Sequence, residues 1–144
     1  MDVSELRKQI LRAIDEARKD VAGRRTVLDA SRKAYDEFLT VAASPLFKQA
    51  AAVLTAENHP FVVHTPSETI RLVSENSPET FLEMGLDTST PEPSVIGRVS
   101  LTRGRQGVIV EERPIAPGTD VAALKEADVS AFLIAEIPKL ILKP

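Results

Sequence analysis

The 144-residue chain contains no cysteine. A disulfide framework, a thiolate metal site and a cysteine nucleophile are therefore excluded, and nothing ties the chain to an oxidising compartment. Tryptophan is also absent, and the aromatic residues are one tyrosine and five phenylalanines. So few aromatic side chains argue against the stacking platforms that hold single-stranded nucleic acid or sugars. They also predict a core built mainly from leucine, isoleucine, valine and alanine.

Motifs that mark common active sites are missing too. The sequence has no nucleophile motif of the form G-x-S-x-G or S-x-x-K. It also lacks both common glycine-rich phosphate-binding loops, G-x-x-x-x-G-K-[ST] and G-x-G-x-x-G. The two histidines, His59 and His64, lie an odd interval apart, which on a strand sends side chains to opposite faces and away from a shared metal. Glu83 and Asp87 share a face of a predicted strand, where solvation explains two carboxylates without catalysis. We therefore expect no enzymatic activity, no catalytic residue, no metal and no cofactor.

The composition is that of an ordinary globular protein, with 43% hydrophobic and 27% charged residues. At this length we expect one domain over residues 1–144. The N-terminal segment is acidic and amphipathic, unlike a signal peptide, and the apolar runs are shorter than the ~20 residues that span a bilayer. These features predict a cytoplasmic protein without a membrane partner. The net charge of −3 also opposes binding to nucleic acid.

Charges of one sign are grouped along the second half of the chain. Residues 60–92 contain one arginine and six acidic residues, whereas residues 93–117 contain four arginines and two glutamates. Zones of opposite sign suit self-association or a charged protein partner, and neither zone is large enough to attract a polyanion.

The first proline is Pro45, and residues 1–43 have the pattern of a long amphipathic helix. Asp2 followed by Glu5 is typical of a capped helix start. Apolar residues then recur with an average period of about 3.5 residues, interrupted at Arg24 and Ser31, as along the line where two helices associate. We call this line the seam, and its members are Val3, Ile10, Ile14, Ala17, Val21, Leu28, Tyr35 and Phe38.

Gly23 leaves two alternatives open for this segment. Thr26 and Asp29 could cap a second helix, which would make "AGRRT" the turn of a helical hairpin. The seam keeps its register across Gly23, however, and one glycine inside a helix costs only about 1 kcal/mol. We therefore favour a continuous helix.

A continuous helix has a consequence for assembly. About 42 helical residues span roughly 63 Å at 1.5 Å per residue, whereas a compact domain of this size is roughly 37 Å across. One end of the helix must then overhang its own domain and leave the seam uncovered. We therefore predict a homodimer that forms through this helix.

The remaining sequence predicts an α+β fold. Ser44 and Pro45 are a typical N-cap and first-turn pair for a second helix over residues 45–57. Between residues 60 and 115, alternating patterns bounded by turn residues predict an antiparallel meander of five strands, near 61–64, 69–74, 80–87, 94–103 and 107–115. On the last two strands we expect the inward side chains to be Val95, Val99, Leu101, Val108 and Val110.

The C-terminal segment, residues 119–142, carries a broad apolar stripe and predicts a helix that lies on the sheet. Two forms are open: one helix bent at Pro138, or two pieces broken near Asp128.

The most basic stretch is the turn of the last predicted hairpin, within "VSLTRGRQGVIVEERP" (residues 99–114). Gly104 and Gly107 supply the positive φ angles that a short hairpin turn needs. Arg98, Arg103 and Arg105 are candidate contacts for an anion or a partner protein. Simpler explanations are also open, because arginine at a solvated tip needs no ligand and Arg98 could pair with Glu112 across the strands.

Together, these features predict a non-catalytic homodimer that acts as a protein-binding module, of an adaptor or chaperone-like kind. The alternative is a small-molecule-binding or minor enzymatic domain with a pocket between the sheet and the C-terminal helix.

Overall fold

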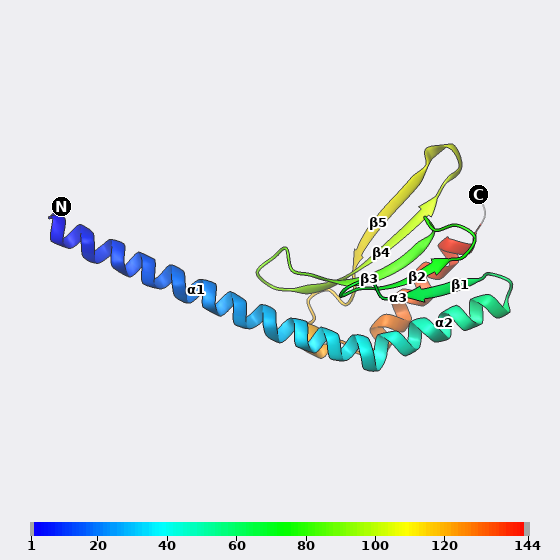
Figure 1. The fold of residues 1–144 in the computed structure, drawn as a ribbon, viewed down its shortest axis with the longest axis horizontal. Coiled ribbons are helices and arrows are strands. Elements are labelled where there is room, and N and C mark those ends of the chain that lie inside the picture. Colours follow the sequence, from blue (N-terminus) through cyan, green and yellow to red (C-terminus); the bar gives the residue numbers. More distant parts are fainter. Residues whose placement is uncertain (1, 143–144) are drawn as a thin grey trace.

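The computed structural model describes residues 2–142 and has the predicted α+β architecture. A five-stranded antiparallel sheet, with the strand order β1-β2-β3-β4-β5, carries helices on one face and is open on the other (Figure 1). The α-helices are α1 (Val3–Phe38), α2 (Ser44–Ala56) and α3 (Glu126–Ile141). The strands are β1 (Phe61–His64), β2 (Ile70–Ser74), β3 (Phe81–Asp87), β4 (Ser94–Thr102) and β5 (Val108–Pro114).

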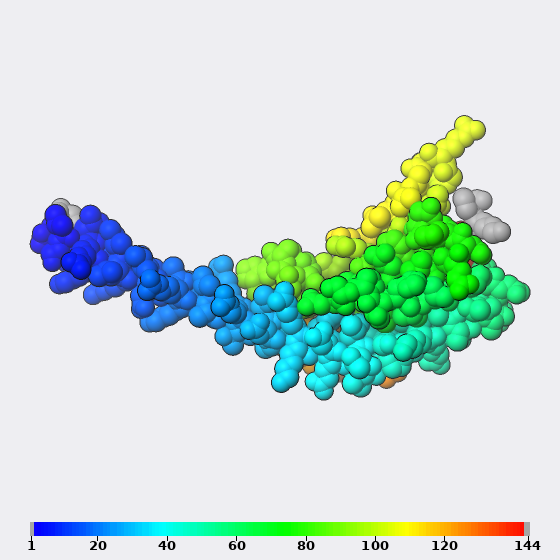
Figure 2. All heavy atoms as spheres, in the orientation of Figure 1, coloured from blue at the N-terminus to red at the C-terminus, as the bar shows by residue number. Residues whose placement is uncertain are grey.

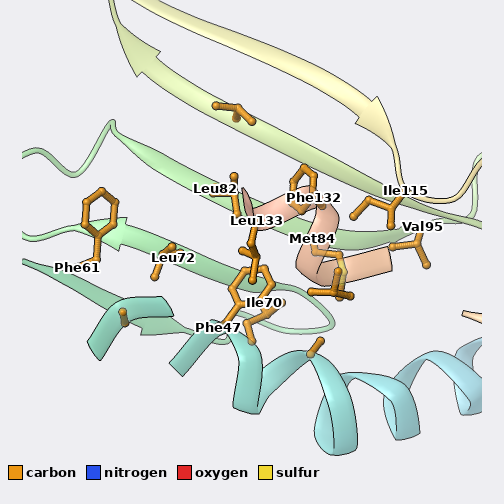
Figure 3. Close-up of a cluster of buried hydrophobic side chains, with 14 of the residues drawn as sticks. Phe47, Phe61, Ile70, Leu72, Leu82, Met84, Val95, Ile115, Phe132 and Leu133 are labelled. Carbon is orange, nitrogen blue, oxygen red and sulfur yellow. The ribbon is translucent and has the colours of Figure 1, made fainter. Parts of the chain in front are cut away.

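The strand register places one set of alternate side chains against the helices. Leu72, Leu82 and Val99 lie directly opposite one another on β2, β3 and β4, and all three are buried. With Phe47 of α2 and Phe132 of α3 they belong to one hydrophobic core between the sheet and the helices (Figure 3). The aliphatic core expected from the composition is therefore present, with three buried phenylalanines and Tyr35 added to it.

The prediction of which β5 side chains point inward is wrong. The side chains expected inward on β4 are buried: Val95, Val99 and Leu101. On β5, however, Val108 and Val110 are 52% and 56% exposed. Ile109 lies opposite Leu101, and residues directly opposite share a face, so Ile109 lies on the helix side and both valines on the open side. A run of three β-branched residues fits either face, and the register that decides between them is set by the turn.

Helix α1 passes through Gly23 without a break, so of the two alternatives the structure has the continuous helix. Its first turn is capped by Asp2, whose carboxylate accepts a hydrogen bond from the Ser4 N–H at 3.4 Å. At 36 residues the helix is about 54 Å long. Most of it projects away from the sheet and the other helices (Figure 1).

The break expected before Pro45 is absent. A π-helical turn, Leu39–Ala43, joins α1 to α2, and Ser44 has helical backbone angles (φ −59°, ψ −47°) instead of those of an N-cap. Pro45 has no N–H, and its ring would collide with the carbonyl four residues earlier in a regular α-helix. The wider π turn accommodates the proline at the cost of a bend, which is visible between α1 and α2 (Figure 1).

The continuous helical segment Val3–Ala56 contains an 18-residue stretch with a mean hydropathy of 1.3, which is long and apolar enough to cross a membrane by length and composition. The prediction that all apolar runs are too short to span a bilayer is therefore wrong for this stretch. Charged residues confine the stretch to residues 37–56, where Phe47, Ala51 and Leu54 are buried in the core. The core helix of a globular domain meets the same criterion, so the stretch is weak support for a membrane location.

Helix α3 begins at Glu126, seven residues after the expected start at 119. Residues Val121–Ala123 form a separate 3-10 turn. The Lys125 N–H donates to the Asp128 carboxylate at 2.9 Å and caps the new helix. This cap separates the turn from α3, close to the break near Asp128 that the sequence left open.

Helix α3 is held close to the sheet by one aromatic contact. The Phe132 ring lies so near Gly97 of β4 that a Cβ at this position would collide with it. Phe132 itself is 1% exposed. Glycine at position 97 is therefore required by the packing of α3 and not by backbone conformation.

We expect Gly97→Ala to lower the free energy of unfolding by about 1–3 kcal/mol, because the added methyl group forces Phe132 out of its position. Gly23→Ala is the matched control, since a Cβ there meets nothing within 4 Å and the change raises helix propensity. Urea unfolding of both variants measures the difference. Equal stability of Gly97→Ala and the wild type would contradict this account of the sheet–α3 contact.

Candidate functional site

An uncovered apolar stripe runs along the N-terminal part of α1. Every residue from 2 to 27 is exposed. The N-terminal part of α1 stands clear of the other elements, and the loop 88–93 first approaches the helix at Arg24 (Figure 2). We call the five seam residues within it the bare seam: Val3, Ile10, Ile14, Ala17 and Val21. Their neighbours Leu6, Leu11 and Val27 are exposed as well, which widens the stripe.

The other three seam residues are covered by the chain itself. Tyr35 is 1% exposed, and its hydroxyl donates to the Met84 carbonyl oxygen at 3.2 Å. Burial, with the nearby charges of Asp36 and Glu83, raises the pKa of Tyr35 far above its usual value. Phe38 is half-buried against the core, and Leu28 is half-buried beside the loop 88–93 between β3 and β4. The seam therefore leaves the core and continues into solvent without a change of register.

A row of four charged residues, which His64 extends onto β1, crosses the open face of the sheet; we call it the charged row. From β1 to β5, the register aligns His64, Arg71, Glu83, Arg98 and Glu112. Arg71 donates to Oε2 of Glu83 at 2.6 Å and lies 4.1 Å over the Phe81 ring. Arg98 donates to Glu112 at 2.9 Å, so the cross-strand pair that the sequence left open is present. This pairing holds Arg98 in the middle of the sheet, away from the hairpin tip.

A hollow of about 460 Å³ lies beside this row and is lined by both Glu83 and Asp87. Asp87 accepts a hydrogen bond from the Ser89 hydroxyl at 2.6 Å, which lowers the pKa of the Asp87 carboxyl. Glu83 is 7% exposed and bound to Arg71. The two carboxylates share a face, as predicted, and each is engaged in a local structural contact.

The hairpin tip keeps its arginines exposed but separates them. The turn is a single 3-10 turn, and Gly104 and Gly107 have the expected positive φ angles of 48° and 79°. Arg103 lines a groove between the hairpin and the end of α3, and Arg105 lies outside it. The other side chains that line this groove include Leu101, Lys139, Leu140 and Leu142.

The alternative function places a pocket between the sheet and the C-terminal helix, and the groove lies at one end of that interface. In the middle of that interface, the Phe132 ring fills the space over Gly97. The hollow is therefore displaced to the end of α3, where it is open to solvent.

An ion-pair cluster around the buried Glu136 ties α3 to β5, and it was not predicted from the sequence. Glu136 is 4% exposed; its Oε1 accepts from Arg113 at 2.8 Å, and its Oε2 lies 2.8 Å from Lys139 Nζ. Burial acts to raise the pKa of Glu136, but the ammonium of Lys139 and the guanidinium of Arg113 outweigh it and hold the pKa below the ordinary value. The same contact raises the pKa of Lys139. One signal was available, because Glu136 interrupts the apolar stripe of α3.

The two histidines lie close together in the chain, around β1. His59 follows α2 in a turn, and His64 ends β1. Within residues 2–142, no group of three metal-ligating side chains is placed to hold a metal ion.

No protein-family model, curated protein or solved structure matches this chain. Its function has to be inferred from geometry, and the bare seam, the open sheet face and the groove beside Arg103 are the features available for that.

We expect Glu136→Gln to change how stability depends on pH. The folded-state pKa of Glu136 is below its ordinary value of 4.5, so the carboxylate contributes stability above that pH and loses it as the pH falls through the folded pKa. At neutral pH the variant should be about 1–3 kcal/mol less stable, and this gap should narrow on acidification. Urea unfolding at several pH values measures it.

Glu75→Gln is the matched control, because Glu75 is exposed in a turn. It should leave the pH profile of the wild type unchanged. A gap between Glu136→Gln and the wild type that stays constant from neutral to acid pH would contradict the role given to Glu136.

Proposed function

We propose that this protein is a non-catalytic homodimer, joined through the bare seam of α1, that binds a further protein with its open sheet face. The observation that carries the proposal is the continuity of the seam from buried Tyr35 to exposed Ile10 and Ile14.

The energetics of an isolated helix support the dimer. Most helix stability in proteins comes from packing an apolar face and not from the intrinsic propensity of the residues. Residues 2–27 of α1 have no such packing within the described chain. A second copy would cover the bare seam and supply it. Contiguous apolar surfaces of this kind mark sites of association.

The layering of the sheet supports the second half of the proposal. Helices α2 and α3 cover one face, and the other is open (Figure 1). Next to the charged row, the register aligns a mainly apolar row across the same open face: Val62, Val73, Phe81, Ser100 and Val110. An apolar row flanked by paired charges suits a protein surface better than a polyanion, because the arginines are already neutralised.

We expect the wild type to have a mass near twice 15.7 kDa in light scattering at micromolar concentration. Ile10→Glu/Ile14→Glu should be monomeric, because it places charges in the buried seam. The helical content of this variant should also fall, because the N-terminal part of α1 loses its packing against the second copy.

Arg12→Glu is the matched control: it adds the same change of charge, and Arg12 is exposed on the side of α1 away from the seam. It should remain dimeric. A wild type that stays at 15.7 kDa at high micromolar concentration would refute the dimer.

A second candidate function is the binding of a small anionic ligand in the groove at the end of α3. The favouring observation is that Arg103 lines the groove together with the apolar Leu101 and Leu140. Lys139 also lines it, but its ammonium is already paired with Glu136. A carboxylate or phosphate with an apolar body fits that combination.

A thermal-shift series with inorganic phosphate and aliphatic carboxylates tests this candidate. A ligand at a hundred times its Kd should add about 2.7 kcal/mol of stability. Arg103→Ser should abolish the shift, whereas Arg105→Ser should keep it, because Arg105 lies outside the groove. Absence of any shift, or equal loss in both variants, would exclude the groove as the site.

A further inference from the structure

We infer that the two copies of α1 pair in antiparallel orientation over residues 3–21, with the sheet domains at opposite ends. This inference rests on the dimer proposed above and adds its geometry. The register we propose places each seam position opposite the one whose number completes a sum of 24, so that Val3 of one copy faces Val21 of the other.

The position of the chain's own domain excludes a parallel, in-register partner. Tyr35, Phe38 and Leu28 belong to the same seam and face the sheet and the loop 88–93. A straight α-helix drifts only ~20° per seven residues from the seam direction. Over the two heptads from Tyr35 to Val21 the drift amounts to ~40°, so the bare seam at Val21 still faces broadly the side of the helix that the domain occupies further along.

A parallel second helix on the bare seam would continue into that domain. In a parallel pair the two sheet domains lie at the same height along the helices. The domain of each copy would then collide with the helix of the other beyond Arg24. In an antiparallel pair, the second helix runs the other way and its own domain lies beyond the first helix's N-terminal turns. The free length of α1, residues 2–27, accommodates a paired segment that ends before Leu28.

The seam residues complement each other in the antiparallel register. The position between Val3 and Ile10 on the seam is Arg7, and the position after Val21 is Arg24. Antiparallel pairing stacks Ile10 on Ile14 twice at the centre, and it places Arg7 opposite Ala17, whose small side chain leaves room for the arginine stem to reach water. Arg24 falls outside the paired segment.

A parallel register lacks this complementarity. It sets Arg7 against Arg7, Arg24 against Arg24, and Ala17 against Ala17, which gives two like-charge contacts and one poorly filled layer. The parallel pair would gain an ion pair between Asp20 and Arg25 of the second copy, but such exposed pairs contribute little.

The residues beside the seam agree with the antiparallel register. In such a pair, equivalent flanking positions face each other across the two-fold axis, which here lies near residue 12. Leu11 then meets Leu11, and Ala13 meets Ala13, close to the centre. This accounts for the exposure of Leu11, 54% in the single chain, on an otherwise charged flank.

Distances between spin labels test the orientation directly. The chain has no cysteine, so a single cysteine gives one label per copy. Arg12→Cys and Lys33→Cys both lie at exposed positions on the side of α1 away from the seam. Each is measured by double electron–electron resonance on the full chain.

The antiparallel pair predicts a short distance, about 20 Å, for labels at position 12, because both lie at the two-fold axis. For position 33 it predicts about 60 Å, since each label is 21 residues from that axis along the helix. A short distance at position 12 with a distance below about 40 Å at position 33 would overturn the antiparallel pairing and leave the dimer standing. No distance between copies at either position would refute the dimer itself.

Discussion

The apolar seam of α1 is the constraint on which the rest of the structure depends. One end of it is anchored, because Tyr35 is buried and its hydroxyl binds the Met84 carbonyl on β3. From that anchor the helix continues outward with the same period, and Ile10 and Ile14 are left in solvent. The free part of this helix has no apolar contact with the described part of its own domain, and the dimer that we propose would cover it.

The sheet domain fixes the direction in which α1 leaves. The π turn before Pro45 bends the helix while α2 stays packed under the sheet. On the same face, α3 is held by the contact of Phe132 with Gly97 and by the ion pairs of Glu136. Both helices occupy one face, so the other face, with its apolar and charged rows, is open (Figure 1). The proposed protein partner would bind this open face.

The elements were predictable because their signals are local. A period near 3.5 identified α1, and alternation between turn residues identified five strands in the correct order. Contacts that depend on register were not predictable in the same way: Val108 and Val110 face solvent, and Arg71 pairs with Glu83 across strands whose alignment the sequence does not state. The prediction of a helix start at Pro45 was wrong for a related reason, because a proline is compatible both with the start of a helix and with the residue after a π turn. The bare seam was found in advance because it needs only helix length and spacing.

Hydrogen exchange along α1, followed at increasing protein concentration, tests the central claim most directly. If a second copy covers the bare seam, amides of residues 3–21 should become protected as the concentration rises through the dimer Kd. Amides of residues 35–56, which are packed in the core of each chain, should be protected at every concentration. Exchange of residues 3–21 at one fast rate, independent of concentration, would contradict the account.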